Sequence, residues 1–121
     1  MRQREFEELV RWALEELPEE FLSHIDNVDV LVLDWPTQRQ IRANGLGPGD
    51  TLFGLYEGVP LTERSGYNLV PPDTITIFQR PIEAACRTPE EIVTQVHHTV
   101  VHEFAHHFGI SDEQLEEWGV A

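Results

Sequence analysis

The sequence predicts a single α+β domain over residues 1–121, in which a small sheet packs against helices. Three observations lead to this prediction: an amphipathic helical repeat near the N-terminus, short strand-type segments in the middle of the chain, and a long helix-type segment in the last third. A chain of 121 residues suits one modest core, and it shows no linker or internal repeat that would divide it.

The first expected element is an amphipathic helix. Its apolar residues recur at helical spacing with charged residues between them: Phe6, Leu9, Val10, Ala13, Leu14 and Leu17. Because proline does not continue a helix, this element should end before Pro18, and its apolar face should lie against the sheet. A short second helical stretch is expected over residues 19–23.

Three segments are predicted to form strands. Residues 28–33 are rich in Val and Leu, which predicts a buried strand. Residues 44–50 are dense in turn formers, so a loop should precede an apolar strand over 51–56. Residues 60–72 read as irregular, and residues 74–78 alternate small polar with large apolar side chains. This alternation predicts a half-buried strand whose polar face is open to a peptide.

The last third begins with a helix start signal. Thr88 is an N-cap residue, Pro89 suits the first turn, and Glu91 completes a capping box. A broad apolar stripe continues the helix through Ile92, Val93, Val96, Val100, Phe104 and Phe108. Gly109 is expected to end it in a left-handed conformation. Ser111 should then cap a short C-terminal helix.

The long helix carries an HExxH motif. His102 and His106 are four residues apart, so they lie one turn apart on one face and two imidazoles can approach one zinc ion. Glu103 projects to a neighbouring part of the surface, from which a carboxylate can act as general base on a zinc-bound water.

A third protein ligand is expected from the residues that follow. Gly109 lets the chain turn sharply, and Asp112, three residues later, is placed to return to the histidines. His102, His106 and Asp112 would hold one Zn²⁺ and leave a fourth position for water, as in a catalytic site. Asp112 is preferred, although an acidic residue at a helix start is also favourable on its own. The competing carboxylates are Glu113, Glu116 and Glu117.

The stretch HTVVHEFAHHFGISDEQL resembles the signature of the minimal zincin-like metallopeptidases, a family of short bacterial proteins. The similarity extends through TLFGLYEGVPLTERS and PDTITIFQRPIE, and it covers most of residues 28–118. The resemblance implies an α+β, zincin-like fold with a small mixed sheet against an N-terminal helix and a long active-site helix, followed by a short C-terminal helix. By position it places the metal ligands on His102, His106 and Asp112 and the catalytic glutamate on Glu103.

The resemblance also implies that an extended peptide binds along an edge strand, a role assigned to residues 74–78. Unlike the metzincins, the chain has an aspartate in place of the third histidine. Its one methionine is Met1, so a methionine turn is absent.

Charge and cysteine content limit the classes of partner and the cellular compartment that we expect. The formal net charge is −14, from 22 acidic residues against 8 arginines, and such a field disfavours nucleic acid and anionic membranes. Cys86 is the one cysteine, so no intramolecular disulfide forms. No signal-type or membrane-spanning segment is evident. We expect a cytoplasmic monomer that acts on a peptide or protein substrate.

Three functions from different classes are therefore considered. The preferred one is a zinc-dependent hydrolase that cleaves peptide bonds, with Glu103 as general base. A metal-dependent ribonuclease is the alternative, since related helices with histidines four apart occur in RNA-processing enzymes, although those lack the glutamate. A non-catalytic zinc domain that binds a partner is the third, and it would need a fourth protein ligand such as His24.

Several other residues near the motif have two interpretations each. His98 is an outer partner of the metal site or an ordinary helix histidine, and His107 orients a ligand or has no role in the site. Tyr56 and Tyr67 are candidates to stabilise an oxyanion, but packing explains them equally well. Cys86 is expected to be an inert, buried thiol.

Overall fold

The structure is a computed structural model that describes residues 1–25, 27–47, 49–58 and 72–120. Its helices and strands are, in order, α1 (Gln3–Glu15), α2 (Glu19–Leu22), the 3-10 turn η1 (Ser23–Ile25), β1 (Val28–Leu33), α3 (Gln38–Ala43), β2 (Gly54–Glu57), β3 (Asp73–Phe78), α5 (Gln79–Ala85), α6 (Pro89–Phe108) and α7 (Asp112–Glu117). The predicted α+β class is confirmed. The irregular segment expected over residues 60–72 lies almost wholly outside the described residues.

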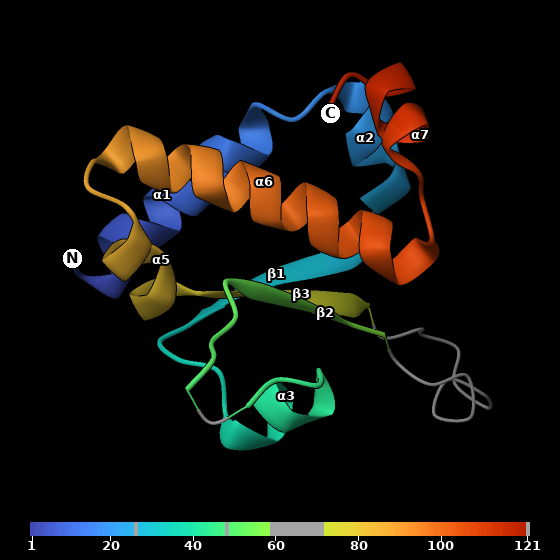
Figure 1. Cartoon of the computed structure of the whole chain (residues 1–121). Coiled ribbons are helices and arrows are strands. Elements are labelled where there is room, and N and C mark those ends of the chain that lie inside the picture. Colours follow the sequence, from blue (N-terminus) through green and yellow to red (C-terminus); the bar gives the residue numbers. More distant parts are fainter. Residues whose placement is uncertain (26, 48, 59–71, 121) are drawn as a thin grey trace.

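Helices lie on both sides of a mixed three-stranded sheet. The strand order is β1-β3-β2, with β1 parallel and β2 antiparallel to β3. Figure 1 shows α1 and α6 over one face of the sheet and α3 on the opposite side. The long helix α6 therefore lies across the sheet with one side toward the strands and the other accessible. None of the described helices is both long and apolar enough to cross a membrane.

The main core lies between the sheet and the helices α1 and α6. Its fully buried members include Phe6 and Ala13 of α1, Ile75 and Ile77 of β3, and Val100 of α6. On the other side of the sheet, Ile41, Leu55 and Phe78 are buried outside this cluster. Successive residues of a strand point to opposite faces, so β3 contributes side chains to both layers.

Residues 28–33 form a strand as expected, but the expectation that this strand is buried is wrong. The strand is present, but Val28, Val30 and Val32 are only partly buried, while Leu31 and Leu33 are 48% and 47% exposed. The physical reason is that β1 is an edge strand and only its face toward the helices is covered. The Gln3 side-chain amide donates to the Val32 carbonyl at 3.2 Å, which satisfies one polar group of this edge.

The strand over residues 74–78 is present, but its predicted role at a sheet edge is contradicted. β3 pairs with β1 on one side and with β2 on the other, so its backbone groups cannot receive a peptide strand. Thr76 is also buried, at 3% exposure, so the polar face is not open. A strand order depends on pairings between distant segments, and the alternation of residues along one strand does not report it. The expected strand over 51–56 begins later, at Gly54.

Two short helices were not predicted from the sequence. The α3 helix begins with a capping box in which the Thr37 hydroxyl accepts from the Gln40 N–H at 3.0 Å, and the Gln40 carboxamide accepts from the Thr37 N–H at 2.9 Å. The pattern Thr-x-x-Gln is the signal that could have located it. The α5 helix follows β3 directly, and Pro81 lies in its first turn.

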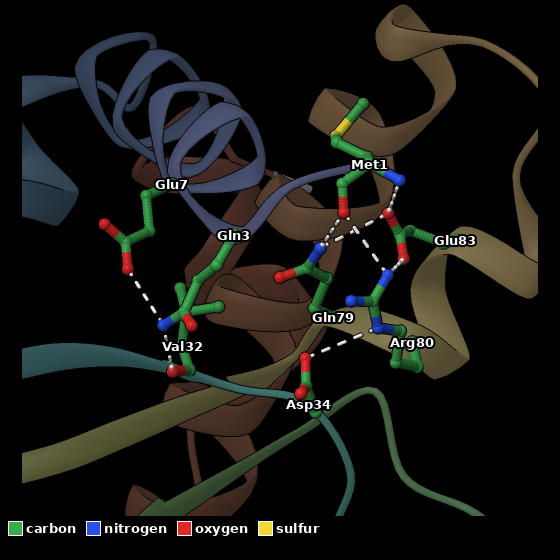
Figure 2. Close-up of polar contacts among 8 residues, drawn as sticks. All are labelled: Met1, Gln3, Glu7, Val32, Asp34, Gln79, Arg80 and Glu83. Atoms are coloured by element: carbon green, nitrogen blue, oxygen red, sulfur yellow. Dashed lines mark hydrogen bonds and ion pairs between the residues drawn. The ribbon is translucent and has the colours of Figure 1, made fainter.

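The N-terminal end of α1 is held against α5 by polar contacts (Figure 2). The Gln79 amide donates to the Met1 carbonyl at 2.9 Å, and Gln79 is fully buried. Arg80 donates to Glu83 at 2.8 Å and lies 3.4 Å from Asp34 at the end of β1. These contacts connect β1, α5 and α1, and they fix the end of the sheet remote from the C-terminus of α6.

We predict that Gly54→Ala destabilises the protein by about 1 to 3 kcal/mol, because it overpacks the contact between β2 and α6. A Cβ atom at Gly54 would lie 2.5 Å from the Thr99 methyl carbon and 3.1 Å from the Thr76 carbonyl oxygen. Urea denaturation measures the change. Gly49→Ala is the matched control because a Cβ there meets nothing within 4 Å.

Thr99→Ser removes the contacted methyl group, so it should recover part of the stability lost in Gly54→Ala. Equal midpoints for Gly54→Ala and Gly49→Ala would contradict the close approach of the strand to the helix.

Candidate metal centre

The long helix places the three residues of the motif as predicted. The Thr88 hydroxyl accepts from the Glu91 N–H at 3.1 Å, and the Glu91 carboxylate accepts from the Thr88 N–H at 2.9 Å, so the predicted capping box is confirmed. The helix then runs to Phe108 without interruption. His102 and His106 are exposed on one face, and Glu103 beside them is partly buried.

The chain turns back after the helix in the expected way. Gly109 adopts φ +65° and ψ 33°, a left-handed conformation, and the Ile110 N–H donates to the Ala105 carbonyl at 2.9 Å. The Ser111 hydroxyl accepts from the Gln114 N–H at 3.1 Å, which starts α7. The Gln114 side chain does not complete a capping box, since it donates to Glu117.

One cavity of about 370 Å³ gathers the four predicted site residues. Its lining comprises His102, Glu103, Ala105, His106, Ile110, Asp112 and Leu115. The turn at Gly109 thus brings Asp112, in the first turn of α7, to the same cavity as the motif. Leu115 and Ala105 are buried apolar residues that form its inner wall.

The side chains around this cavity do not converge on a single point. Among the described residues, no group of three or more His, Cys, Asp or Glu side chains is drawn together closely enough to hold a metal ion. The donor set itself fits zinc, because two imidazoles and a carboxylate are ligands that zinc prefers and the cavity has room for a further ligand. The assignment of His102, His106 and Asp112 as ligands stays a prediction.

Glu103 lies at the contact between the helix and β2. One of its carboxylate oxygens accepts a hydrogen bond from the Tyr56 N–H at 3.2 Å. Burial raises the pKa of the Glu103 carboxyl above its ordinary value, while the Tyr56 N–H and the imidazoles of His106 and His102 act in the opposite direction. A more basic carboxylate is a better proton acceptor, which suits a general base.

A second cavity shares His102 and Glu103 with the first. It has a volume of about 400 Å³ and lies between α6 and the segment that leads into β2. Its lining is Thr51, Leu52, Phe53, Gly54, Gln95, His98, Thr99, His102 and Glu103. His102 and Glu103 therefore line both cavities.

Two histidines beside the motif have defined contacts. The rings of His98 and His102 have centroids 4.0 Å apart, so His98 extends the histidine row. Partial burial and the neighbouring His102 and His97 lower the pKa of His98. The His107 ring stacks on Tyr56 with centroids 4.1 Å apart.

Tyr56 packs in the core, which agrees with the second of its two interpretations. It is buried, and its hydroxyl donates to Asp73 at 2.7 Å. Tyr67 lies outside the described residues. Cys86 is only partly buried, which corrects the expectation of a buried thiol; burial raises the pKa of this thiol, and the nearby Glu91 adds to the effect.

A closed site with His24 as fourth ligand finds no support in the described part of the chain. The His24 ring stacks on Trp118 at a centroid distance of 4.0 Å, and the residue does not line the cavity. The alternative carboxylates Glu113, Glu116 and Glu117 do not line it either. Within the described residues, the position of Asp112 fits the predicted third ligand better than theirs.

The outer edge of the described sheet beside this site belongs to β2. The Phe53 carbonyl accepts from the Phe78 N–H at 2.9 Å, so the polar groups of Phe53 and, two residues on, of Leu55 face β3. Those of Gly54 and Tyr56 face away from it. Among the described strands nothing pairs with this side of β2.

Comparison with known proteins identifies the family of the chain. No curated protein matches the chain. A family model described as zincin-like metallopeptidase matches residues 25–120, which include β1 to β3, α6 and the whole HExxHxxGxxD stretch. The chain belongs to the zincin-like metallopeptidase family.

Proposed function

We propose that this protein is a zinc-dependent peptidase in which His102, His106 and Asp112 bind one zinc ion and Glu103 is the general base. The family implies zinc binding and peptidase chemistry. The observation that supports the residue assignment is the single cavity lined by all four side chains, which three separate elements of the fold bring together: α6, the turn at Gly109 and α7.

The roles follow from the chemistry of each side chain. Zinc, when bound, would polarise the scissile carbonyl and lower the pKa of a water to about 7. The Glu103 carboxylate takes one proton from the attacking water as the oxygen of that water bonds to the carbonyl carbon. It then returns that proton to the nitrogen of the leaving amine as the carbon–nitrogen bond breaks.

The substrate proposed is an extended peptide segment placed along the outer edge of β2. Gly54 directs its backbone N–H and carbonyl away from β3, and on the same edge the Tyr56 N–H donates to Glu103. A peptide on this edge would pass between the two cavities that share His102 and Glu103. The net charge of −14 favours peptide segments without a strong negative charge.

The test combines metal quantitation with digestion of a peptide library by the purified protein. We expect about one zinc per chain, from the single predicted site with three protein ligands. Cleavage should be abolished by a chelator and restored by zinc, and structured RNA in a parallel reaction should stay intact. Cleavage that persists after the zinc has been removed would refute the proposal. Chelator-sensitive cleavage of the RNA would favour the ribonuclease.

A further inference from the structure

We infer that Tyr56 is a positioning residue for Glu103: its backbone N–H holds the carboxylate at the outer edge of β2, and its side chain locks that N–H in place. This inference rests on the proposed role of Glu103 as general base. It assigns to Tyr56 a function different from oxyanion stabilisation, because its hydroxyl points to Asp73, with which it forms a 2.7 Å hydrogen bond.

The direction of the Tyr56 N–H makes the carboxylate its natural acceptor. This N–H faces away from β3, the described strand with which β2 pairs. Tyr56 is only 7% exposed, and a buried N–H without an acceptor is unfavourable. Glu103 supplies the acceptor at 3.2 Å. Both groups therefore gain from the contact, and the carboxylate is restrained through one oxygen while the other is left for proton transfer.

The Tyr56 ring is fixed against the same turns of α6 that carry Glu103. It stacks on His107, four residues after Glu103, with centroids 4.1 Å apart. Its edge contacts are with Phe104 and Phe108, at centroid distances of 6.1 Å and 5.4 Å. The aromatic ring thus sets the spacing between β2 and the helix at the level of the proposed base.

The hydroxyl group fixes the other end of the ring. Asp73 begins β3, and its carboxylate accepts from the Tyr56 hydroxyl. A hydrogen bond to a charged group is stronger than one between neutral groups. Rotation or withdrawal of the ring would break this bond as well as the stacking, so the backbone at residue 56 is constrained from two sides.

The hydrogen bond is tested first by NMR, without any need for turnover. In the zinc-loaded protein, Glu103→Ala removes the acceptor, so the amide proton of Tyr56 should shift upfield and exchange faster with solvent. Glu103→Gln retains a carbonyl oxygen and should preserve most of the exchange protection. An amide proton that does not respond to Glu103→Ala would overturn the inference.

Positioning is then tested by kinetics on a responsive peptide. Tyr56→Leu deletes the stacking and the hydroxyl, and we expect kcat to fall about tenfold with KM within about twofold, because misplacement of a reacting group acts mainly on the chemical step. Tyr56→Phe keeps the ring and should recover most of this loss. Zinc content should be unchanged in both variants.

Phe6→Leu is the control for a general loss of core packing, since Phe6 is fully buried in α1. It should destabilise the protein to a similar degree and leave kcat unchanged when assayed below the unfolding transition. An equal loss of kcat in Phe6→Leu would overturn the positioning role. A wild-type protein that cleaves no peptide would overturn the peptidase proposal. This outcome is distinct from an unchanged Tyr56 amide proton in Glu103→Ala, which would overturn the positioning inference.

Discussion

The Glu103→Gln variant should fold, bind zinc as the wild type does and lose peptide cleavage by about 10²- to 10⁴-fold, the usual contribution of a general base. Glutamine has nearly the same shape as glutamate, and its carbonyl oxygen can still accept from the Tyr56 N–H. It cannot take a proton from water at neutral pH. The loss should therefore fall on kcat and not on stability.

The measurement is kcat on a responsive peptide, with zinc content and the unfolding midpoint measured on the same samples. Glu90→Gln is a matched control, because Glu90 is an exposed glutamate in the first turn of the same helix and lies far along it from the motif. Its kcat should match that of the wild type. Wild-type cleavage by Glu103→Gln would remove Glu103 from the mechanism.

The second large effect is expected on zinc affinity. Asp112→Ala should weaken zinc binding by more than about 100-fold, because even the outer partners of metal ligands contribute 10- to 100-fold and Asp112 is proposed as a direct ligand. The side chain is exposed in the first turn of α7, so its loss should cost the fold less than about 1 kcal/mol through the helix dipole.

Competition with a chromophoric chelator measures the zinc affinity, and circular dichroism reports whether the fold is kept. Glu113→Ala is the discriminating control, since Glu113 is the next residue of α7 but does not line the cavity. It should bind zinc as tightly as the wild type. The reverse pattern, with zinc lost in Glu113→Ala and kept in Asp112→Ala, would transfer the third ligand to Glu113.

Local patterns located the helices that carry the site. The spacing of His102 and His106 is read directly from a helical repeat of 3.6 residues, and the capping box at Thr88 and the glycine at position 109 mark the ends of α6. These features depend on residues within a few positions of one another. Their geometry is set by backbone sterics and local hydrogen bonds, which the order of residues reports reliably.

Strand order and burial could not be obtained in the same way. Residues 74–78 alternate like a half-exposed strand, yet β3 is central and its Thr76 is buried. Residues 28–33 look like a buried strand, yet β1 is an edge strand with exposed leucines. Which strand is central depends on pairing between segments some 20 to 45 positions apart, and many registers satisfy the same local alternation.

By itself, then, the order of amino acids indicated the α+β class through its helix-type and strand-type patterns. It also indicated the long helix and the candidates for zinc and base, because these depend on residues that lie within about one or two helical turns of one another. Only the tertiary structure decided that β2 forms the edge beside Glu103 and that Tyr56 holds its carboxylate. That hydrogen bond joins residues 47 positions apart. Such a contact exists only after the sheet and the helix have packed together, and no local pattern encodes it.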